Sequence, residues 1–273
     1  MTPDLPPELL DAALNLLDSR QDWVRCSLVC RAWLPICRVK LFSKVTLTTP
    51  LVEYLEKEHS MGILGPYIRH AEIVSPGDPS DWSEQVIKRP FPLLRKFENL
   101  DILTINDLSC DNDINDLLRN PWPLYTVRQL HLVNLYCYSF SALRSLIGAF
   151  PGLESVNMRN VEWDMEEEPN SDSRDLCPSF HLQDVEVRSE TSKTVPRPFF
   201  GWLLTGSAKN ASPLRALRVD LDPDDRETCL TFQRLLSAKG LSLEQLDISP
   251  VTLRPDRLRE FTCQSSASLP WCT

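Results

Sequence analysis

The sequence predicts an α/β fold in which a short helical unit is followed by a curved parallel β-sheet backed by helices. Three observations lead to this prediction. The first 48 residues carry more apolar side chains than so short a unit can bury. A trio of apolar residues, spaced as in L-x-x-L-x-L, then recurs eight times along the chain. Between the copies lie stretches of helical periodicity, and strand–helix–strand units of this length pair their strands in parallel through right-handed crossovers.

Three short helices are expected between residues 5 and 45. Pro6 and Pro7 suit the start of the first helix, because proline at the first helical position loses no hydrogen bond. Ser19 or Asp22 can cap the second helix, and the third begins near Trp33. Since three such helices enclose little volume, some of their apolar side chains must stay exposed, which is typical of a surface that binds a partner.

Two motifs in this unit resemble the F-box: L-P-P-E at residues 5–8 and L-V-C-R-A-W at residues 28–33. The segment that follows, residues 40–47, is similar to the end of the F-box in proteins of higher fungi. The resemblance covers residues 3–48. It implies binding to the Skp-family subunit of a cullin-RING ubiquitin ligase, the SCF complex, in a substrate adaptor for ubiquitin-dependent degradation. The residues that would be buried against that subunit are Leu5, Pro6, Leu9, Leu28, Val29, Trp33 and Leu34. A three-helix cap without a partner is the alternative.

The eight apolar trios predict eight strands. Their middle residues follow one another at steps of 26 to 32 residues, at or slightly above the upper end of leucine-rich repeats. These middle residues are Val45, Ala71, Leu103, Leu130, Val156, Val185, Leu217 and Leu246. Helices are expected at residues 51–61, 81–97, 139–150, 199–207 and 224–240. The sequence therefore predicts a right-handed solenoid that resembles a leucine-rich-repeat array with a curved parallel sheet.

The repeats depart from the leucine-rich-repeat pattern at one position. Three residues after the last member of the trio, that family usually has Asn or Cys, whose side chain bonds the neighbouring turn. Four copies here carry a different residue: Leu108, Leu135, Val161 and Val251. We therefore expect no asparagine ladder and an irregular curvature.

Strand residues that alternate with the apolar trio are expected to line the hollow face of the solenoid. The middle outward positions are Thr104, His131, Asn157, Glu186, Arg218 and Asp247. From these and their neighbours we predict a target-binding surface formed by His131, Asn157, Arg159, Glu186, Arg188, Arg218 and Asp220. A mixed-charge row suits a polar peptide or protein surface, and an ordinary solvated sheet face is the alternative.

Composition narrows the possible functions. The 29 basic and 38 acidic residues give a net charge of −9, which argues against binding to nucleic acid or to an anionic membrane. No phosphate-binding glycine loop or hydrolase motif occurs, so we expect neither an enzyme nor a cofactor. The nine cysteines include no C-x-x-C pair, which predicts free thiols and no metal site. Residues 1–10 do not resemble a signal peptide, so we expect a cytoplasmic or nuclear protein, not a secreted one.

The expected domains are a helical unit at residues 3–48, a repeat region at 49–263 and a disordered tail at 264–273. Two other functions stay open. One is a repeat protein that binds partners without any ubiquitin-ligase role. The other is an enzyme whose pocket would bring His131 together with a carboxylate and a nucleophile.

Overall fold

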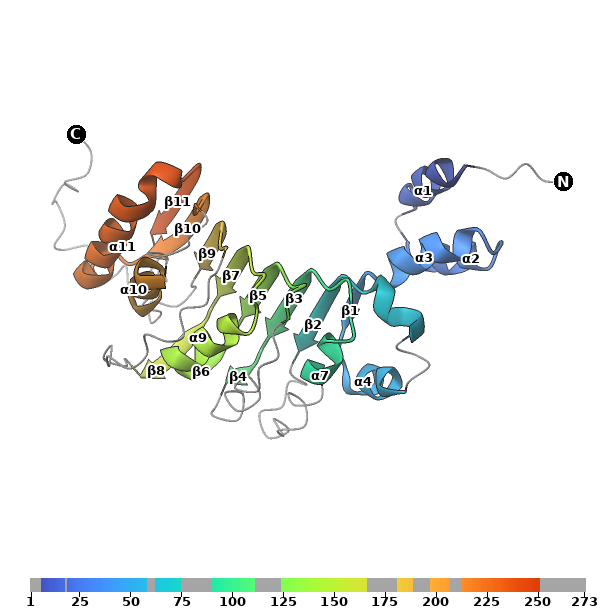
Figure 1. The fold of residues 1–273 in the computed structure, drawn as a ribbon, viewed down its shortest axis with the longest axis horizontal. Helices are drawn as coiled ribbons and strands as arrows, with labels where there is room; N and C mark the ends of the chain where they lie inside the picture. The colour runs from blue at the N-terminus through green and yellow to red at the C-terminus, as the bar shows by residue number, and fades with distance from the viewer. Residues whose placement is uncertain are drawn as a thin grey trace, which may run out of the picture.

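A computed structural model describes residues 6–17, 19–57, 62–74, 90–110, 124–165, 181–188, 197–206 and 213–250. The chain forms an elongated sheet, with connecting helices along one side and a helical unit at the N-terminal end (Figure 1).

The N-terminal unit consists of α1 (Pro7–Asn15), α2 (Arg20–Ser27) and α3 (Trp33–Phe42). Proline occupies the first turn of α1, and the Ser19 hydroxyl accepts a hydrogen bond from the Gln21 N–H at the start of α2. Ser19 is therefore the cap, and Asp22 instead forms an ion pair with Arg25 at 3.2 Å. The expected three helices are present.

The sheet contains eight strands, and every neighbouring pair is parallel. The strands lie side by side in chain order, and each contains the middle residue of one predicted apolar trio. They are β1 (Lys44–Thr46), β2 (His70–Val74), β3 (Ile102–Asn106), β5 (Gln129–Val133), β7 (Ser155–Arg159), β9 (Asp184–Arg188), β10 (Ala216–Leu221) and β11 (Gln245–Pro250). Repeat spacing thus predicted the strand positions and their parallel order.

Helices connect the strands close to the predicted places. The described ones are α4 (Thr49–Glu56), η1 (Gly65–Tyr67), α7 (Pro90–Leu94), α9 (Phe140–Gly148), α10 (Arg197–Gly206), α11 (Arg226–Lys239) and η4 (Gly240–Ser242). Ser139 caps α9 by accepting a bond from the Ala142 N–H, and Asp225 caps α11 by accepting one from the Thr228 N–H. The beginning of the helix expected at 81–97 lies outside the described residues.

A second, three-stranded parallel sheet was not predicted. Its strands are β4 (Ser109–Cys110), β6 (Tyr136–Ser139) and β8 (Glu162–Met165). Each follows a strand of the main sheet after a short turn, and Leu135 and Cys137 continue the apolar alternation into the core. This continued alternation was the sequence signal for the second strand.

The expectation of no ladder was wrong, because a polar ladder lies one position earlier than in leucine-rich repeats. Asp107, Asn134 and Asn160 form the turns between the two sheets, with φ of 54°, 50° and 52°. Asn134 donates to the Asp107 carboxylate at 2.8 Å, and Asn160 donates to the Asn134 carbonyl at 3.1 Å. Asn and Asp tolerate the left-handed conformation better than other non-glycine residues, which explains why they occupy these turns.

The core lies between the sheets and the helices. The core-facing side chains of the central strands, such as Leu103, Leu130 and Val156, are fully buried. On the last described strand, by contrast, Leu246 and Ile248 are about half exposed.

The domain limits at 48 and 263 stay predictions, and the expected tail at 264–273 lies outside the described residues.

Candidate functional site

The helical unit formed by α1, α2 and α3 buries few of its apolar side chains and leaves several exposed to solvent. Among its described apolar side chains, only Leu14 and Cys37 are fully buried, and burial raises the pKa of the Cys37 thiol. In contrast, the exposed fractions are 57% for Leu9, 81% for Leu28 and 64% for Val29. Packing among α1, α2 and α3 therefore leaves an apolar surface open, as the composition of this segment predicted.

The other residues of the predicted Skp-binding set differ in exposure. Pro6 is exposed where α1 begins, whereas Trp33 and Leu34 are partly buried in the first turn of α3. Leu5 lies outside the described residues. Leu28, Val29, Trp33 and Leu34 are close in the chain around the α2–α3 corner, and Leu9 lies on α1.

Two exposed apolar residues of this unit were not in the predicted set. Leu16, at the end of α1, has an exposed fraction of 82%, and Val24 on α2 is also exposed. Helical spacing did not identify them, because Leu16 lies just beyond the last residue of α1 and α2 has only eight residues, too few to define one face clearly.

The helical unit continues into the sheet without a linker. Helix α3 ends at Phe42, and β1 begins two residues later. The Ser43 carbonyl accepts hydrogen bonds from the N–H groups of Arg69 and His70 at 2.9 and 2.8 Å, and β1 pairs in parallel with β2. The end of the helical unit is therefore part of the sheet.

The predicted outward row is present in the pairing register. Thr104 pairs with His131, His131 with Asn157, and Asn157 with Glu186. Glu186 in turn pairs with Arg218, and Arg218 with Asp247. We call the side of the main sheet that carries this row the polar sheet face.

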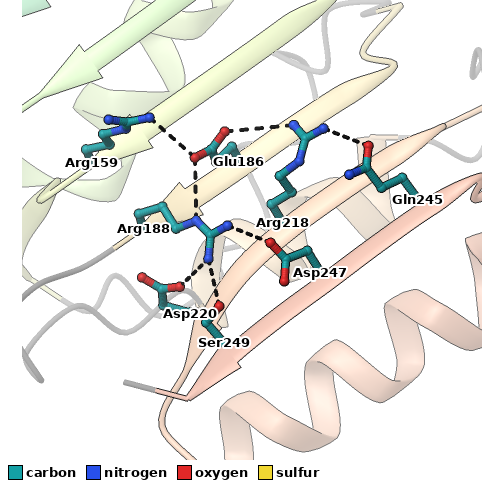
Figure 2. A network of polar contacts seen from close by, with 8 residues as sticks. All are labelled: Arg159, Glu186, Arg188, Arg218, Asp220, Gln245, Asp247 and Ser249. Carbon is teal, nitrogen blue, oxygen red and sulfur yellow. Dashed lines mark hydrogen bonds and ion pairs between the residues drawn. The ribbon is translucent and has the colours of Figure 1, made fainter. Parts of the chain in front are cut away.

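The C-terminal half of the polar sheet face is a continuous network of charged side chains (Figure 2). Glu186 accepts contacts from three arginines: Arg159 at 3.6 Å, Arg218 at 3.8 Å and Arg188 at 3.5 Å. Arg218 also donates to the Gln245 side chain at 2.7 Å. The structure thus brings four of the predicted target-binding residues into direct contact.

Arg188 is the centre of this network. Its guanidinium donates to Asp220 and Asp247 at 2.8 Å each and to the Ser249 hydroxyl at 2.9 Å. Hydrogen bonds to Asp220, then to Asp247, raise the pKa of Arg188 above its ordinary value. Because most of its donors are used within the protein, Arg188 orients the carboxylates around it.

Two histidines lie toward the N-terminal end of the same face. The ring centroids of His70 and His131 are 6.5 Å apart, and His70 Nε2 is 2.9 Å from the Thr104 hydroxyl. Burial lowers the pKa of both histidines, and the positive charge of Lys44 near His70 and of Arg159 near His131 adds to this. Both rings therefore favour the neutral form.

Neither a metal centre nor a membrane span was found in the described ranges. There, no group of three or more His, Cys, Asp or Glu side chains is placed to hold a metal ion. No helix in those ranges has the length and apolar character needed to cross a bilayer.

Comparison with known proteins gives one family. The F-box-like family model matches residues 2–48, which include α1, α2, α3 and β1. A search of curated proteins found no match. The matched segment contains the exposed apolar side chains of Leu9, Leu28 and Val29. The chain therefore carries an F-box-like domain at residues 2–48.

Proposed function

We propose that this protein is a substrate adaptor of an SCF ubiquitin ligase. Its F-box-like domain would bind the Skp-family subunit, and the polar sheet face would bind a target protein for ubiquitin-dependent degradation. In this proposal the chain itself catalyses no reaction. It would accelerate ubiquitin transfer by holding the target near the ubiquitin-charged enzyme, which raises the effective concentration of the two reactants.

The exposed apolar surface of the F-box-like domain is the observation that carries this proposal. Several solvent-exposed leucine and valine side chains in so small a domain lower solubility, so their presence favours a partner that covers them. We assign Leu5, Pro6, Leu9, Leu28, Val29, Trp33 and Leu34 to this interface. Leu28 and Val29 are the most informative of the set, because they are exposed and their replacement leaves the buried residues Leu14 and Cys37 untouched.

The polar sheet face supports the second half of the proposal. The row from Thr104 to Asp247 comes from six parallel strands and stands in register, so that its side chains form one continuous surface. We also infer that the sheet belongs to a right-handed solenoid of the leucine-rich-repeat type. For target binding we assign His131, Asn157, Arg159, Glu186, Arg188, Arg218 and Asp220, with Arg188 acting through the neighbours that it orients.

Co-purification of the full-length chain with a Skp-family subunit tests the proposal. We expect the wild-type chain to retain the subunit and the double variant Leu28→Asp, Val29→Asp to lose it, because two carboxylates would have to be buried in an apolar interface. Leu230→Asp is the matched control, since Leu230 is an exposed apolar residue on α11 at the opposite end of the molecule. Equal retention by the double variant and the control would contradict the interface.

A repeat protein without a ligase role is the second candidate. The polar sheet face favours it to the same degree, because target binding does not require a Skp-family subunit. This candidate predicts that even the wild-type chain retains no such subunit. We assign no catalytic role to His131, whose neighbours on this face include His70, Arg159 and Glu186.

A further inference from the structure

Ser249 stands out on the polar sheet face because of its place in the chain. It is the residue before the end of β11, and Pro250 follows it directly. Strand β11 is the last strand of the main sheet and pairs only with β10 in the described part of the chain. Ser249 is partly exposed there, in the extended conformation in which protein kinases bind their substrates.

The group that faces Ser249 is a guanidinium. Arg188 Nη1 donates to the Ser249 hydroxyl at 2.9 Å, and the same nitrogen donates to Asp220 at 2.8 Å. Arginine binds phosphate through two parallel N–H bonds, and these bonds are shorter and stronger than a bond to a neutral hydroxyl. A phosphate on Ser249 would therefore find a positioned cation already within reach.

We propose that Ser249 is a phosphorylation site for a proline-directed serine/threonine kinase and that Arg188 holds the phosphate. In the reaction, the Ser249 hydroxyl oxygen attacks the γ-phosphorus of MgATP. The new O–P bond forms as the bond from the γ-phosphorus to the β-phosphate oxygen breaks. ADP leaves, and the hydroxyl proton passes to the base of the kinase.

The modification would change the charge of the polar sheet face. The network now contains three arginines and three carboxylates, so their formal charges cancel. A phosphoserine adds a charge of about −1.5 to −2 at neutral pH. The phosphate would compete with Asp220 and Asp247 for Arg188, and the more exposed Asp247 is the one free to turn away. Because Asp247 pairs in register with Arg218, its release would alter the part of the face assigned to the target.

Mass spectrometry of the folded full-length chain after incubation with a proline-directed kinase and MgATP tests the site. We expect a phosphopeptide that carries the phosphate on Ser249, and we expect Ser249→Ala to lose only that phosphopeptide. Thr49-Pro50, at the start of α4, is the other described Ser/Thr-Pro pair and serves as an internal comparison. If Ser249 is modified only after the protein has been unfolded, or not at all, the proposal is wrong.

A phosphorus NMR titration tests the role of Arg188. The Arg188→Gln variant should show a higher second pKa for phosphoserine 249 than the wild-type chain, because the dianion loses its cation and keeps two carboxylate neighbours. Arg188→Lys should lie between them. The same pKa in all three proteins would overturn the assignment of Arg188. These outcomes do not depend on binding to a Skp-family subunit, so they are separate from a failure of the proposed function.

Discussion

Arg188 on β9 donates to Asp247 on β11 at 2.8 Å, and the contact spans the intervening strand β10. The same guanidinium also bonds Asp220 on β10 itself. One side chain thus connects the last three strands of the sheet on the polar face, at the end where Leu246 and Ile248 leave the core side partly open.

Replacement of Arg188 should therefore destabilise this end of the sheet. Arg188→Met removes the bonds to Asp220, Asp247 and Ser249 and leaves two carboxylates close together. Charged hydrogen bonds contribute about 1.5–3 kcal/mol each when buried, but solvent screens this partly exposed site, so we expect a total loss of about 1–2 kcal/mol. Urea unfolding measures the difference.

Arg128→Met is the control for Arg188. Arg128 also contacts two carboxylates, Glu154 at 3.3 Å and Asp101 at 4.0 Å, but it lies in a much more exposed position. Surface ion pairs contribute about 0–1 kcal/mol, so the free energy of unfolding should hardly change. An equal loss in both variants would show that Arg188 has no special structural role.

The polar ladder formed by Asp107, Asn134 and Asn160 can be tested at its middle residue. Asn134 bonds both Asp107 and Asn160 and has a φ of 50°. Asn134→Ala should lose the side-chain bonds and keep a Cβ in the left-handed region without the polar side chain that makes asparagine tolerant of it, at a combined cost of about 2–3 kcal/mol. Asn134→Gly also loses the bonds but adopts positive φ freely, so it should be about 1 kcal/mol more stable than the alanine variant. Thermal unfolding of both variants would reveal no such difference if the turn did not require positive φ.

Trp33→Ala should weaken capture of the Skp-family subunit for two reasons. Trp33 belongs to the interface that we propose, and it is partly buried at the start of α3, so its loss also loosens the small helical core. We expect reduced capture together with a lower thermal stability of the helical unit. Leu28→Asp should reduce capture without that loss of stability, and circular dichroism during heating separates the two effects. Unchanged capture by both variants would remove these residues from the interface.

The two histidines predict a dependence of stability on pH. Their pKa values are lowered in the folded protein, so the unfolded chain binds more protons at mildly acidic pH. Their contribution to stability is fully present above the ordinary histidine pKa of about 6.5 and is lost as the pH falls below it. The groups that face them are Lys44, Glu72, Arg159 and Glu186.

Urea unfolding at several pH values between about 5 and 8 measures this effect. We expect the double variant His70→Gln, His131→Gln to lose less stability on acidification than the wild-type chain does. A single His181→Gln variant is the control, because His181 lies outside the main strands. If the stability of the wild type and of the double variant changed with pH in the same way, His70 and His131 would not be the source of the pH dependence.

Deletion of the F-box-like domain should damage the sheet. Strand β1 lies inside the matched segment, and removal of residues 1–48 would leave the edge of β2 without its neighbour. Leu47, which is buried in the core, would also be lost. We expect the truncated chain to unfold at a lower temperature than the full-length chain, whereas an independent repeat domain would keep its original transition. Differential scanning calorimetry distinguishes these outcomes.

Much of the fold was predictable from the sequence because the informative signals are local and periodic. The apolar trios placed all eight strands of the main sheet, and alternation assigned Leu103, Leu130 and Val156 to the core. The same alternation placed His131, Glu186 and Arg218 on the opposite face. The F-box motifs identified the segment that the family model matches.

The tertiary structure decided the relationships between residues that are distant in the chain. The sequence alone gave no reason for Arg188 to bond Asp220, Asp247 and Ser249, because these contacts depend on the register of three strands and on side-chain rotamers. It also could not show that Asn134 would bond the neighbouring turns, since that requires both the stacking of repeats and a left-handed backbone. Periodicity fixes which face a residue occupies, whereas packing fixes which partner it meets.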